Sequence, residues 1–337
     1  MSTPKVSVLI PAYNAERTLE ATLRSVLRQT LQSWECVVVD DGSTDRTAAL
    51  LHEYARRDAR VVATTSEHLG IVGALNKGLE RCRGDYVARL DADDVMHRLR
   101  LERQYAFARC EPEIGALGCH VRIFPRRAGS GGRRGYERWL NSLVDEASLL
   151  RDRFVECPLA HPSFFVRNDV FAAHPYRDVP WAEDYDLLLR LQESGVRVGV
   201  VPEVLLFWRE GPTRLSRVDS RYSIERFVEC KAHFLSRRFL ADESGYVLWG
   251  YGDTGRALAR ALRGHRKHPT HIVELHPGRV GQRIANAPVI APIALRELTP
   301  RPHRIVVSVA GEAARSEIRA RLAEMRFEEG RDYVCAA

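Results

Sequence analysis

The chain has 337 residues, of which 45% are hydrophobic and 28% are charged, as is ordinary for a globular protein. This length exceeds what one hydrophobic core usually supports, so we expect two domains. The formal net charge of +7 is carried almost entirely by arginine, and the sequence has no evident recognition helix or aromatic stacking platform, so we expect no nucleic-acid partner.

Residues 6–47 contain two apolar runs that flank one amphipathic run. Val6–Ile10 and Cys36–Val39 are rich in β-branched residues and bounded by turn residues, which is typical of strands. Leucine and valine recur at helical spacing between them, and a further helix is expected from Thr47 to about Arg57. The pattern predicts a βαβ unit, hence parallel strands.

Polar residues stand where three of the expected strands end. Pro11–Asn14 follow the first strand, Asp40–Ser43 the second, and Asp91–Asp94 an apolar strand that begins near Tyr86. Open parallel sheets bind ligands outside the carboxyl ends of their strands, so these segments are candidates for one site. Turn and helix-cap chemistry alone also explains the segment after the second strand.

Asp91 and Asp93 are the most informative pair in the sequence. Side chains two apart on a strand share a face, so both can converge on one cation. Hard carboxylate oxygens suit Mg²⁺ or Mn²⁺, which typically bridge the phosphates of a nucleotide. The D-x-D spacing alone is a weak signal, because an acidic strand end or turn produces the same pattern.

The middle of the chain adds candidate residues. Arg126–Arg134 is basic and glycine-rich, which predicts a flexible loop that can touch anionic lipid headgroups if an acceptor lies in a membrane. His161 precedes an apolar strand, and Glu183 and Asp184 open an apolar helical run, where the helix dipole favours negative charge. Arg214 has the guanidinium geometry that suits phosphate. A structural histidine, helix capping and a surface arginine are the alternative explanations.

After a helix expected at Arg226–Leu240, the strand and helix pattern restarts. Gly250, Gly252 and Gly255 form G-x-G-x-x-G between a strand and a helix, and Glu274 follows at about the spacing of a dinucleotide fingerprint. These glycines also permit a tight turn and close packing without a ligand, so NAD(P) binding is possible but not expected.

Further strands are expected at residues 288–290 and 304–309, and a helix at 314–325. We therefore predict two domains, 1–240 and 241–337, the second a small Rossmann-like α/β domain.

Five segments occur in a specific order between residues 6 and about 230: VSVLIPAYNAERTL, VVVDDGSTDRT, GIVGALNKGLERCRGDYVARLDADD, HPSFFVR and AEDYDLLLRL. In order and spacing they resemble the family 2 glycosyltransferases of the GT-A fold. The resemblance implies an α/β fold class for residues 1–240, with a mostly parallel sheet flanked by helices. The family usually has asparagine near the position where His68 precedes Leu69 and Gly70.

The resemblance also implies roles for individual residues in three parts of the site. In the donor pocket, Pro11, Ala12, Tyr13 and Asn14 would line the nucleoside, and Asp41 would contact the uracil ring nitrogen. At the metal, Asp93 would be the direct ligand, Asp91 would touch the ribose or a metal-bound water, and Asp94 would support the turn. At the acceptor, Asp184 would take the hydroxyl proton as catalytic base, Glu183 and His161 would orient or contact the acceptor, and Arg214 would contact phosphate.

The expected activity is therefore inverting transfer of a sugar from a UDP-sugar to the hydroxyl of a glycan or lipid-linked glycan, with Mg²⁺ or Mn²⁺. The family implies bacterial surface polysaccharide or glycolipid assembly. No apolar run is long enough to cross a bilayer, so we expect a cytoplasmic protein, with peripheral contact at the inner face of the plasma membrane as a possibility. The alternatives are a catalytically silent nucleotide-sugar-binding or regulatory module and an NAD(P)-binding protein.

Overall fold

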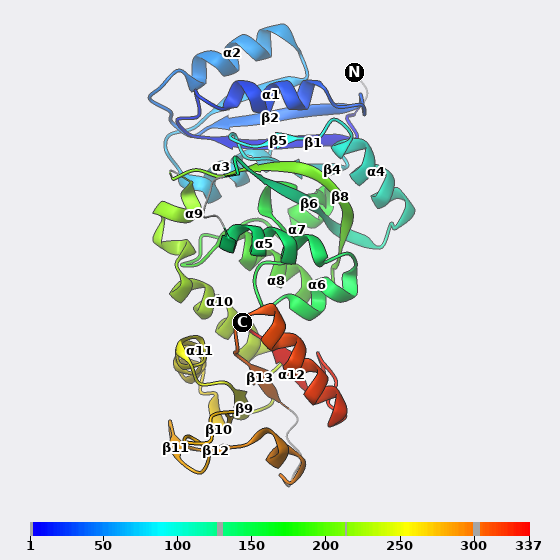
Figure 1. The fold of residues 1–337 in the computed structure, drawn as a ribbon. Coiled ribbons are helices and arrows are strands. Elements are labelled where there is room, and N and C mark those ends of the chain that lie inside the picture. Colours follow the sequence, from blue (N-terminus) through cyan, green and yellow to red (C-terminus); the bar gives the residue numbers. More distant parts are fainter. Residues whose placement is uncertain (1–2, 127–130, 213, 299–303) are drawn as a thin grey trace. The chain divides into compact units, whose positions relative to one another are not determined.

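A computed structural model describes residues 3–126, 131–212, 214–298 and 304–337 (Figure 1). The chain folds into two compact units, each made of several segments. Unit 1 comprises Met1–Leu149, Leu159–Val179 and Asp186–Arg214, and unit 2 comprises Leu150–Pro158, Pro180–Tyr185 and Leu215–Ala337. Residues 215–240, which the sequence places in the first domain, are grouped with unit 2. The division into independent domains at residue 240 stays a prediction.

Unit 1 is built around one eight-stranded sheet with the order β3-β2-β1-β4-β7-β6-β8-β5. Its strands are β1 (Val6–Ala12), β2 (Trp34–Asp40), β3 (Val61–Thr65), β4 (Tyr86–Arg89), β5 (Val95–Met96), β6 (Ile114–Phe124), β7 (Phe165–Arg167) and β8 (Arg197–Arg209). Its helices are α1 (Leu19–Leu27), α2 (Thr47–Arg57), α3 (Gly70–Leu79), α4 (Arg100–Cys110), α5 (Gly131–Ser142) and α7 (Asn168–Ala173), with a short 3₁₀ helix at His161–Ser163. Helices α6 (Glu146–Asp152) and α8 (Glu183–Glu193) each contain residues of both units.

Strands β3, β2, β1 and β4 run parallel, so their carboxyl ends meet at one edge of the sheet (Figure 1). Every residue of β1 and β2 is buried, as expected for central parallel strands covered on both faces. Helix α3 packs on both strands. The predicted βαβ unit and the α/β fold class are therefore confirmed, and the three polar segments lie at the same edge.

At the opposite end of these strands, one buried carboxylate connects three segments. The Ser7 hydroxyl donates to Glu35 Oε1 at 2.7 Å, and the Arg83 guanidinium donates to Glu35 Oε2 at 2.6 and 2.9 Å. The N–H of Gly84 donates to the Ser7 hydroxyl at 2.8 Å. Because Glu35 is only 3% exposed, these donors compensate the desolvation of its charge and fix the entry into β4.

The predicted flexible loop at Arg126–Arg134 is only partly correct. Residues 127–130 lie outside the described part of the chain, but Gly131 begins helix α5. Trp139 and Leu140 bury the inner face of this helix, and the Glu137 carboxylate accepts the backbone N–H of Ile123 at 2.8 Å. Docking on β6 therefore outweighs the low helix propensity of the glycines.

Unit 2 contains a second sheet with the order β11-β12-β10-β9-β13-β14, parallel except for the β11–β12 pair. Its strands are β9 (Gly245–Trp249), β10 (His268–Val273), β11 (Arg283–Ile284), β12 (Ala287–Ile290), β13 (Ile305–Val307) and β14 (Tyr333–Cys335). Its helices are α9 (Leu215–Val218), α10 (Ile224–Arg237), α11 (Asp253–Gly264) and α12 (Glu312–Glu324), with 3₁₀ turns at Ser220–Tyr222 and Pro292–Arg296. The helix expected at Arg226–Leu240 is thus α10, displaced by two to three residues at its ends.

All seven cysteines are free thiols, and only Cys110 is exposed. Burial raises the pKa of the Cys36, Cys82 and Cys119 thiols. Within the described residues, no helix has both the length and the apolar character that crossing a membrane requires.

Replacing Gly84 tests the strand-entry network. A Cβ at this position would lie 2.5 Å from the backbone nitrogen of Ser7, and backbone cannot move aside cheaply. We expect Gly84→Ala to destabilise the protein by about 2 kcal/mol, measured as a lower unfolding temperature. Gly135→Ala is the control, because no atom of the described residues lies within 4 Å of its added Cβ in helix α5. It should raise stability by up to about 1 kcal/mol. Equal effects of the two variants would contradict the packing argument.

Candidate active site

The loop after β1 is locked to the loop after β2. The N–H of Asn14 donates to the Ser43 hydroxyl at 2.8 Å, and Asn14 Oδ1 accepts the N–H of Thr44 at 2.9 Å. Asn14 has a φ of 48°, a left-handed conformation that asparagine tolerates better than most residues. Ala12 accepts the N–H of Asp41 at 2.8 Å through its carbonyl. The predicted nucleoside-binding segments are therefore joined side by side.

Two aromatic rings, those of Tyr13 and His68, lie beside these two loops. Tyr13 is 49% exposed and its ring centroid lies 4.2 Å from that of His68, with a tilt of 33°. The His68 Nδ1 atom lies 3.2 Å from Asp41 Oδ2. A half-exposed aromatic pair beside a carboxylate can stack a planar base and accept hydrogen bonds from it.

The Asp41 carboxylate also anchors the start of α3. It accepts the backbone N–H groups of Leu69 and Gly70 at 2.8 and 2.9 Å and the Ser66 hydroxyl at 3.0 Å. Asp41 is 4% exposed, and this anionic group at a helix N-terminus is favourably placed. Asp41, which the sequence predicts as a ligand contact, therefore also caps the start of α3.

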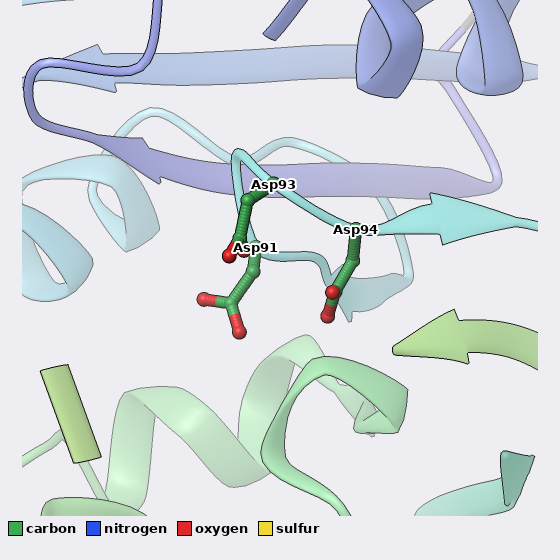
Figure 2. A group of neighbouring side chains, drawn as sticks. All are labelled: Asp91, Asp93 and Asp94. Carbon is green, nitrogen blue, oxygen red and sulfur yellow. The ribbon is translucent and has the colours of Figure 1, made fainter. Parts of the chain in front are cut away.

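Asp91, Asp93 and Asp94 form one acidic group after β4. One oxygen of each carboxylate lies within 4.8 Å of the others. Figure 2 shows the three side chains leaving the loop toward the same side. Asp94 is fully buried, and its Oδ1 accepts the N–H of Arg209 at 2.6 Å. The D-x-D segment therefore brings together three carboxylates, where the sequence predicted two ligands and a supporting residue.

Three arginines surround this acidic group. Arg89 Nη2 lies 2.5 Å from Asp91 Oδ1, and Arg214 Nη2 lies 4.0 Å from Asp91 Oδ2. Arg209 donates through Nε to the carbonyl of Asp93 at 2.5 Å. The guanidinium of Arg214 also lies 4.6 Å from the ring centre of Trp208, a cation–π contact. Arg214 is therefore adjacent to the predicted metal ligands.

The pKa values of two of these carboxyl groups are raised. Burial and the nearby Asp91 charge raise the pKa of Asp93 to about 6, although Arg214 and Arg89 oppose the shift. Burial and the charges of Asp91 and Asp93 raise the pKa of Asp94 as well. Crowded carboxylates that repel one another are a typical environment for a divalent cation, which would neutralise them.

The residues present fit an oxygen-bound cation. Asp94 Oδ2 is buried and has no hydrogen-bond partner in the described chain, and such an atom usually has a water or an ion beside it. Carboxylate oxygens are the ligands that Mg²⁺ and Mn²⁺ prefer. Asp91, Asp93 and Asp94 are thus the residues that would hold the metal.

His161 lies in the 3₁₀ helix before β7 and is 7% exposed. Its Nε2 forms a hydrogen bond of 2.8 Å with the Tyr176 hydroxyl. Burial, together with the positive charge of Arg89, holds the pKa of His161 well below its usual range, so the ring is neutral at pH 7. The predicted acceptor contact stays a prediction.

Glu183 and Asp184 belong to unit 2 and begin α8, as the sequence predicts. Glu183 is 1% exposed and accepts the Tyr222 hydroxyl at 2.6 Å. Asp184 Oδ1 accepts the N–H of the next residue, Tyr185, at 2.8 Å. The catalytic role of Asp184 stays a prediction, while Glu183 has a hydrogen bond that fixes its carboxylate.

The glycine turn of unit 2 lies between β9 and α11. Gly250 has a φ of 91°, and a Cβ on Gly255 would lie 2.3 Å from the Gly250 carbonyl oxygen. Nothing lies within 4 Å of a Cβ built on Gly252. Glu274 Oε1 accepts the N–H of Tyr251 at 2.8 Å, so the acidic residue of the fingerprint binds the turn itself. Two of the three glycines are explained by turn geometry and packing.

Sequence reasoning missed two residues of the site. His68 looked like a departure from a family pattern, yet it pairs with Tyr13 and Asp41. Arg89 looked like an ordinary strand residue, yet it forms an ion pair with Asp91. The available signal for Arg89 was a charged residue inside an otherwise apolar strand directly before the acidic segment.

Comparison with known proteins identifies similar chains. The model of the family described as "Glycosyl transferase family 2" matches residues 7–173. The putative glycosyltransferase EpsE of Bacillus subtilis is 31% identical over 67% of this chain and 81% of its own length. The amylovoran biosynthesis glycosyltransferase AmsE of Erwinia amylovora is 32% identical over 63% of this chain and 78% of its own.

A third relative is matched over a shorter segment. The UDP-Glc:alpha-D-GlcNAc-diphosphoundecaprenol beta-1,3-glucosyltransferase WfgD of Escherichia coli is 41% identical over 29% of this chain and 39% of its own. The chain spans 65% to 81% of the lengths of the first three curated relatives that it matches.

Solved structures of two proteins resemble the fold. TarS 1–349 of Staphylococcus aureus, in complex with UDP, has a TM-score of 0.53 at 20% identity and covers 77% of this chain and 71% of its own. A further crystal structure of TarS 1–349 is in complex with UDP-GlcNAc. The mannosyltransferase PcManGT of Pyrobaculum calidifontis, in complex with GDP-Man and Mn²⁺, has a TM-score of 0.50 at 18% identity and covers 97% of this chain and 82% of its own. These likenesses confirm the predicted GT-A fold class.

The raised pKa of Asp93 predicts that its ionised carboxylate destabilises the folded protein when no metal is bound. The folded-state pKa of about 6 exceeds the unfolded value of about 3.9, so wild-type stability falls as pH rises from about 4 through 6. Asp93→Asn removes this charge, so we expect the variant to be more stable than the wild type at pH 8. Its advantage should shrink below pH 6 and vanish near pH 4.

Thermal unfolding in a buffer with chelator, at pH 8 and pH 4, measures this difference. Asp85→Asn, at an exposed carboxylate of the same unit, is the control and should change stability little at either pH. An Asp93→Asn variant without a gain at pH 8, or with a larger gain at pH 4, would contradict the assignment.

Proposed function

Because the chain belongs to glycosyltransferase family 2, we propose that it transfers a sugar from a UDP-sugar to the hydroxyl of a glycan or lipid-linked glycan, with inversion at the anomeric carbon. The membership confirms the predicted enzyme class, a glycosyltransferase. The observation that carries the proposal is the acidic group Asp91, Asp93 and Asp94, which lies at the same sheet edge as the Tyr13–His68 pair.

The donor site follows from this arrangement. Tyr13 and His68 offer a stacking surface for the base, and the segment Pro11–Asn14 borders it. Asp41 Oδ1 already accepts Ser66 and Leu69, so a ring N–H would bind Oδ2, which accepts Gly70 and has a second lone pair. UDP is the proposed nucleotide, since TarS binds UDP and UDP-GlcNAc; the GDP-Man complex of PcManGT makes a guanine nucleotide the competing choice.

The acidic group and Arg214 would receive the diphosphate. When bound, Mg²⁺ or Mn²⁺ would neutralise the negative charge that develops on the departing nucleoside diphosphate. Asp93 and Asp94 can become ligands only when deprotonated, which their raised pKa values resist in the absence of a cation. The Arg214 guanidinium, 4.0 Å from Asp91, adds a fixed positive charge beside the same phosphates.

The acceptor reaction needs one base. Asp184 is proposed to take the proton from the acceptor hydroxyl while this hydroxyl oxygen attacks the anomeric carbon and the bond to the diphosphate breaks. Glu183 is proposed to act indirectly, because its hydrogen bond to Tyr222 fixes the start of α8. His161 is a candidate acceptor contact in its neutral form.

The acceptor class is proposed from the relatives. AmsE is named for amylovoran biosynthesis, and WfgD acts on a diphosphoundecaprenol-linked sugar. A lipid-linked acceptor would bring the protein to a membrane surface, where Arg134 and Arg138 on α5 face solvent and can meet anionic headgroups. Bacterial surface polysaccharide assembly, in the cytoplasm beside the membrane, is the corresponding proposed setting.

Residues 241–337 are proposed to form a Rossmann-like module. Its parallel strands and glycine turn support this assignment. NAD(P) binding is not part of the proposal, because Glu274 is already bonded to Tyr251 and to Arg279.

Donor binding is the first test. We expect calorimetric titration with UDP-, GDP- and dTDP-sugars to detect binding of a UDP-sugar that requires Mn²⁺. Asp93→Ala should weaken this binding by about 100-fold or more, because it removes a direct metal ligand. Asp85→Asn is the matched control and should bind like the wild type. Absence of binding by every nucleotide sugar, or equal binding by Asp93→Ala, would refute the proposed donor site.

The base is tested separately. Asp184→Asn keeps the shape of the side chain but cannot accept a proton, so we expect donor affinity to stay within about twofold and kcat to fall by about 10²–10⁴-fold. Initial rates of UDP release with a lipid-linked acceptor, together with the donor titration, separate the two effects. Turnover at the wild-type rate would remove Asp184 from the mechanism.

A further inference from the structure

Arg89 is a buried cation in direct contact with the proposed metal site. It is the last residue of β4 and is 3% exposed. Its Nη2 lies 2.5 Å from Asp91 Oδ1. Burial alone would lower the pKa of the guanidinium, but the charge of Asp91 and the hydrogen bond to it raise that pKa above its ordinary value. Arg89 therefore carries a positive charge in contact with Asp91.

The backbone of Arg89 is held firmly in place. Its N–H donates to the Phe164 carbonyl at 2.8 Å, and its carbonyl accepts Arg100 Nη2 at 2.9 Å. Arg100 is itself fully buried and donates through Nε to Gln104 at 2.9 Å. The guanidinium of Arg89 thus starts from a rigid backbone position, which limits where the partner carboxylate can lie.

The side chain of Arg89 is poorly satisfied as a structural element. Its Nε and Nη1 are buried and have no hydrogen-bond partner among the described residues. A second buried arginine–aspartate pair of unit 1, Arg190 with Asp186, differs in this respect. Arg190 donates through Nε to Asp186 at 2.7 Å and through Nη2 to the Pro175 carbonyl at 2.8 Å.

Unpaired buried donors destabilise a fold, and replacing both partners of a buried ion pair by apolar side chains of similar size is often neutral or stabilising. The presence of arginine at residue 89 is therefore not explained by stability. The contact that its guanidinium makes is the ion pair with Asp91.

Asp91 has two oxygens in different surroundings. Oδ1 is held by Arg89, whereas Oδ2 lies 4.0 Å from the Arg214 guanidinium. The side chain as a whole is 22% exposed. The ion pair therefore fixes the carboxylate and leaves one oxygen for a ligand.

We propose that Arg89 is a positioning residue for the divalent cation, which acts by holding Asp91 so that one oxygen of this carboxylate faces the group formed with Asp93 and Asp94. The inference rests on the metal site proposed above.

Mn²⁺ binding to the full-length protein tests the inference without any turnover. Free Mn²⁺ is measured by electron paramagnetic resonance, with the metal alone and with UDP. We expect Arg89→Met to weaken Mn²⁺ binding by at least about tenfold, in the range of other partners that orient metal ligands. The Mn²⁺ affinity of Arg89→Lys should lie between those of Arg89→Met and the wild type, because a lysine keeps the charge but not the planar geometry.

Arg190→Met is the matched control, because it breaks a buried arginine–aspartate pair of the same unit that is remote in the chain from the acidic group. It should lower the unfolding temperature and leave Mn²⁺ binding unchanged. Equal losses of Mn²⁺ affinity in Arg89→Met and Arg190→Met would show a general effect of lost stability and overturn the inference.

A double-mutant cycle tests whether Arg89 acts through Asp91. We expect Arg89→Met combined with Asp91→Asn to bind Mn²⁺ no more weakly than Asp91→Asn alone. Losses that multiply would overturn the inference. If Arg89→Met does not fold, Arg89→Lys decides: affinity equal to the wild type would refute the positioning role, and a loss of at least about threefold would support it.

The outcome for the wild type separates the two proposals. Wild-type protein that binds no Mn²⁺, with or without UDP, refutes the metal site and this inference together. Wild-type binding with unchanged binding by Arg89→Met refutes only the role of Arg89.

Discussion

Mutual repulsion among three carboxylates is the constraint on which the rest of this site depends. Asp91, Asp93 and Asp94 are held within 4.8 Å of one another at the edge of a hydrophobic sheet. Such a group persists only because the surrounding structure fixes it: the backbone of Arg209 holds Asp94, and Arg89 holds Asp91. The repulsion destabilises the folded protein, and the burial of the parallel strands offsets this loss. A bound cation would reduce the repulsion. Ligand affinity and folding stability are thus opposed at the same three residues.

The proposed donor side of the site is organised differently, by hydrogen bonds between loops. Asn14 joins the loops after β1 and β2, and Asp41 joins the second of these to the start of α3. The surface formed by Tyr13 and His68 therefore rests on backbone that is already ordered. A pre-organised surface spares the entropy of ordering it when a base binds.

The fold of the first 100 residues and the position of the acidic segment at the end of β4 could be predicted, because the signals are local. A few consecutive residues indicate each strand end, the acidic segment and the start of α8. Parallel pairing then brings the strand ends to one edge. Contacts between residues distant in sequence could not be predicted. Arg89 resembled any strand residue, and Tyr222 gave no sign of binding Glu183. Helix α5 was not predicted because its sequence is rich in glycine, and its docking on β6 is a contact between distant segments.

The distribution of thiols has a practical consequence for observing this protein. Cys110, at the last residue of α4, is the single exposed cysteine among seven. A maleimide dye or nitroxide label should therefore attach at one native position without prior mutagenesis. Helix α4 begins at Arg100, whose guanidinium binds the carbonyl of Arg89. A reporter at Cys110 is thus connected through one helix to the acidic group, and it offers an optical or magnetic signal for ligand-induced changes there.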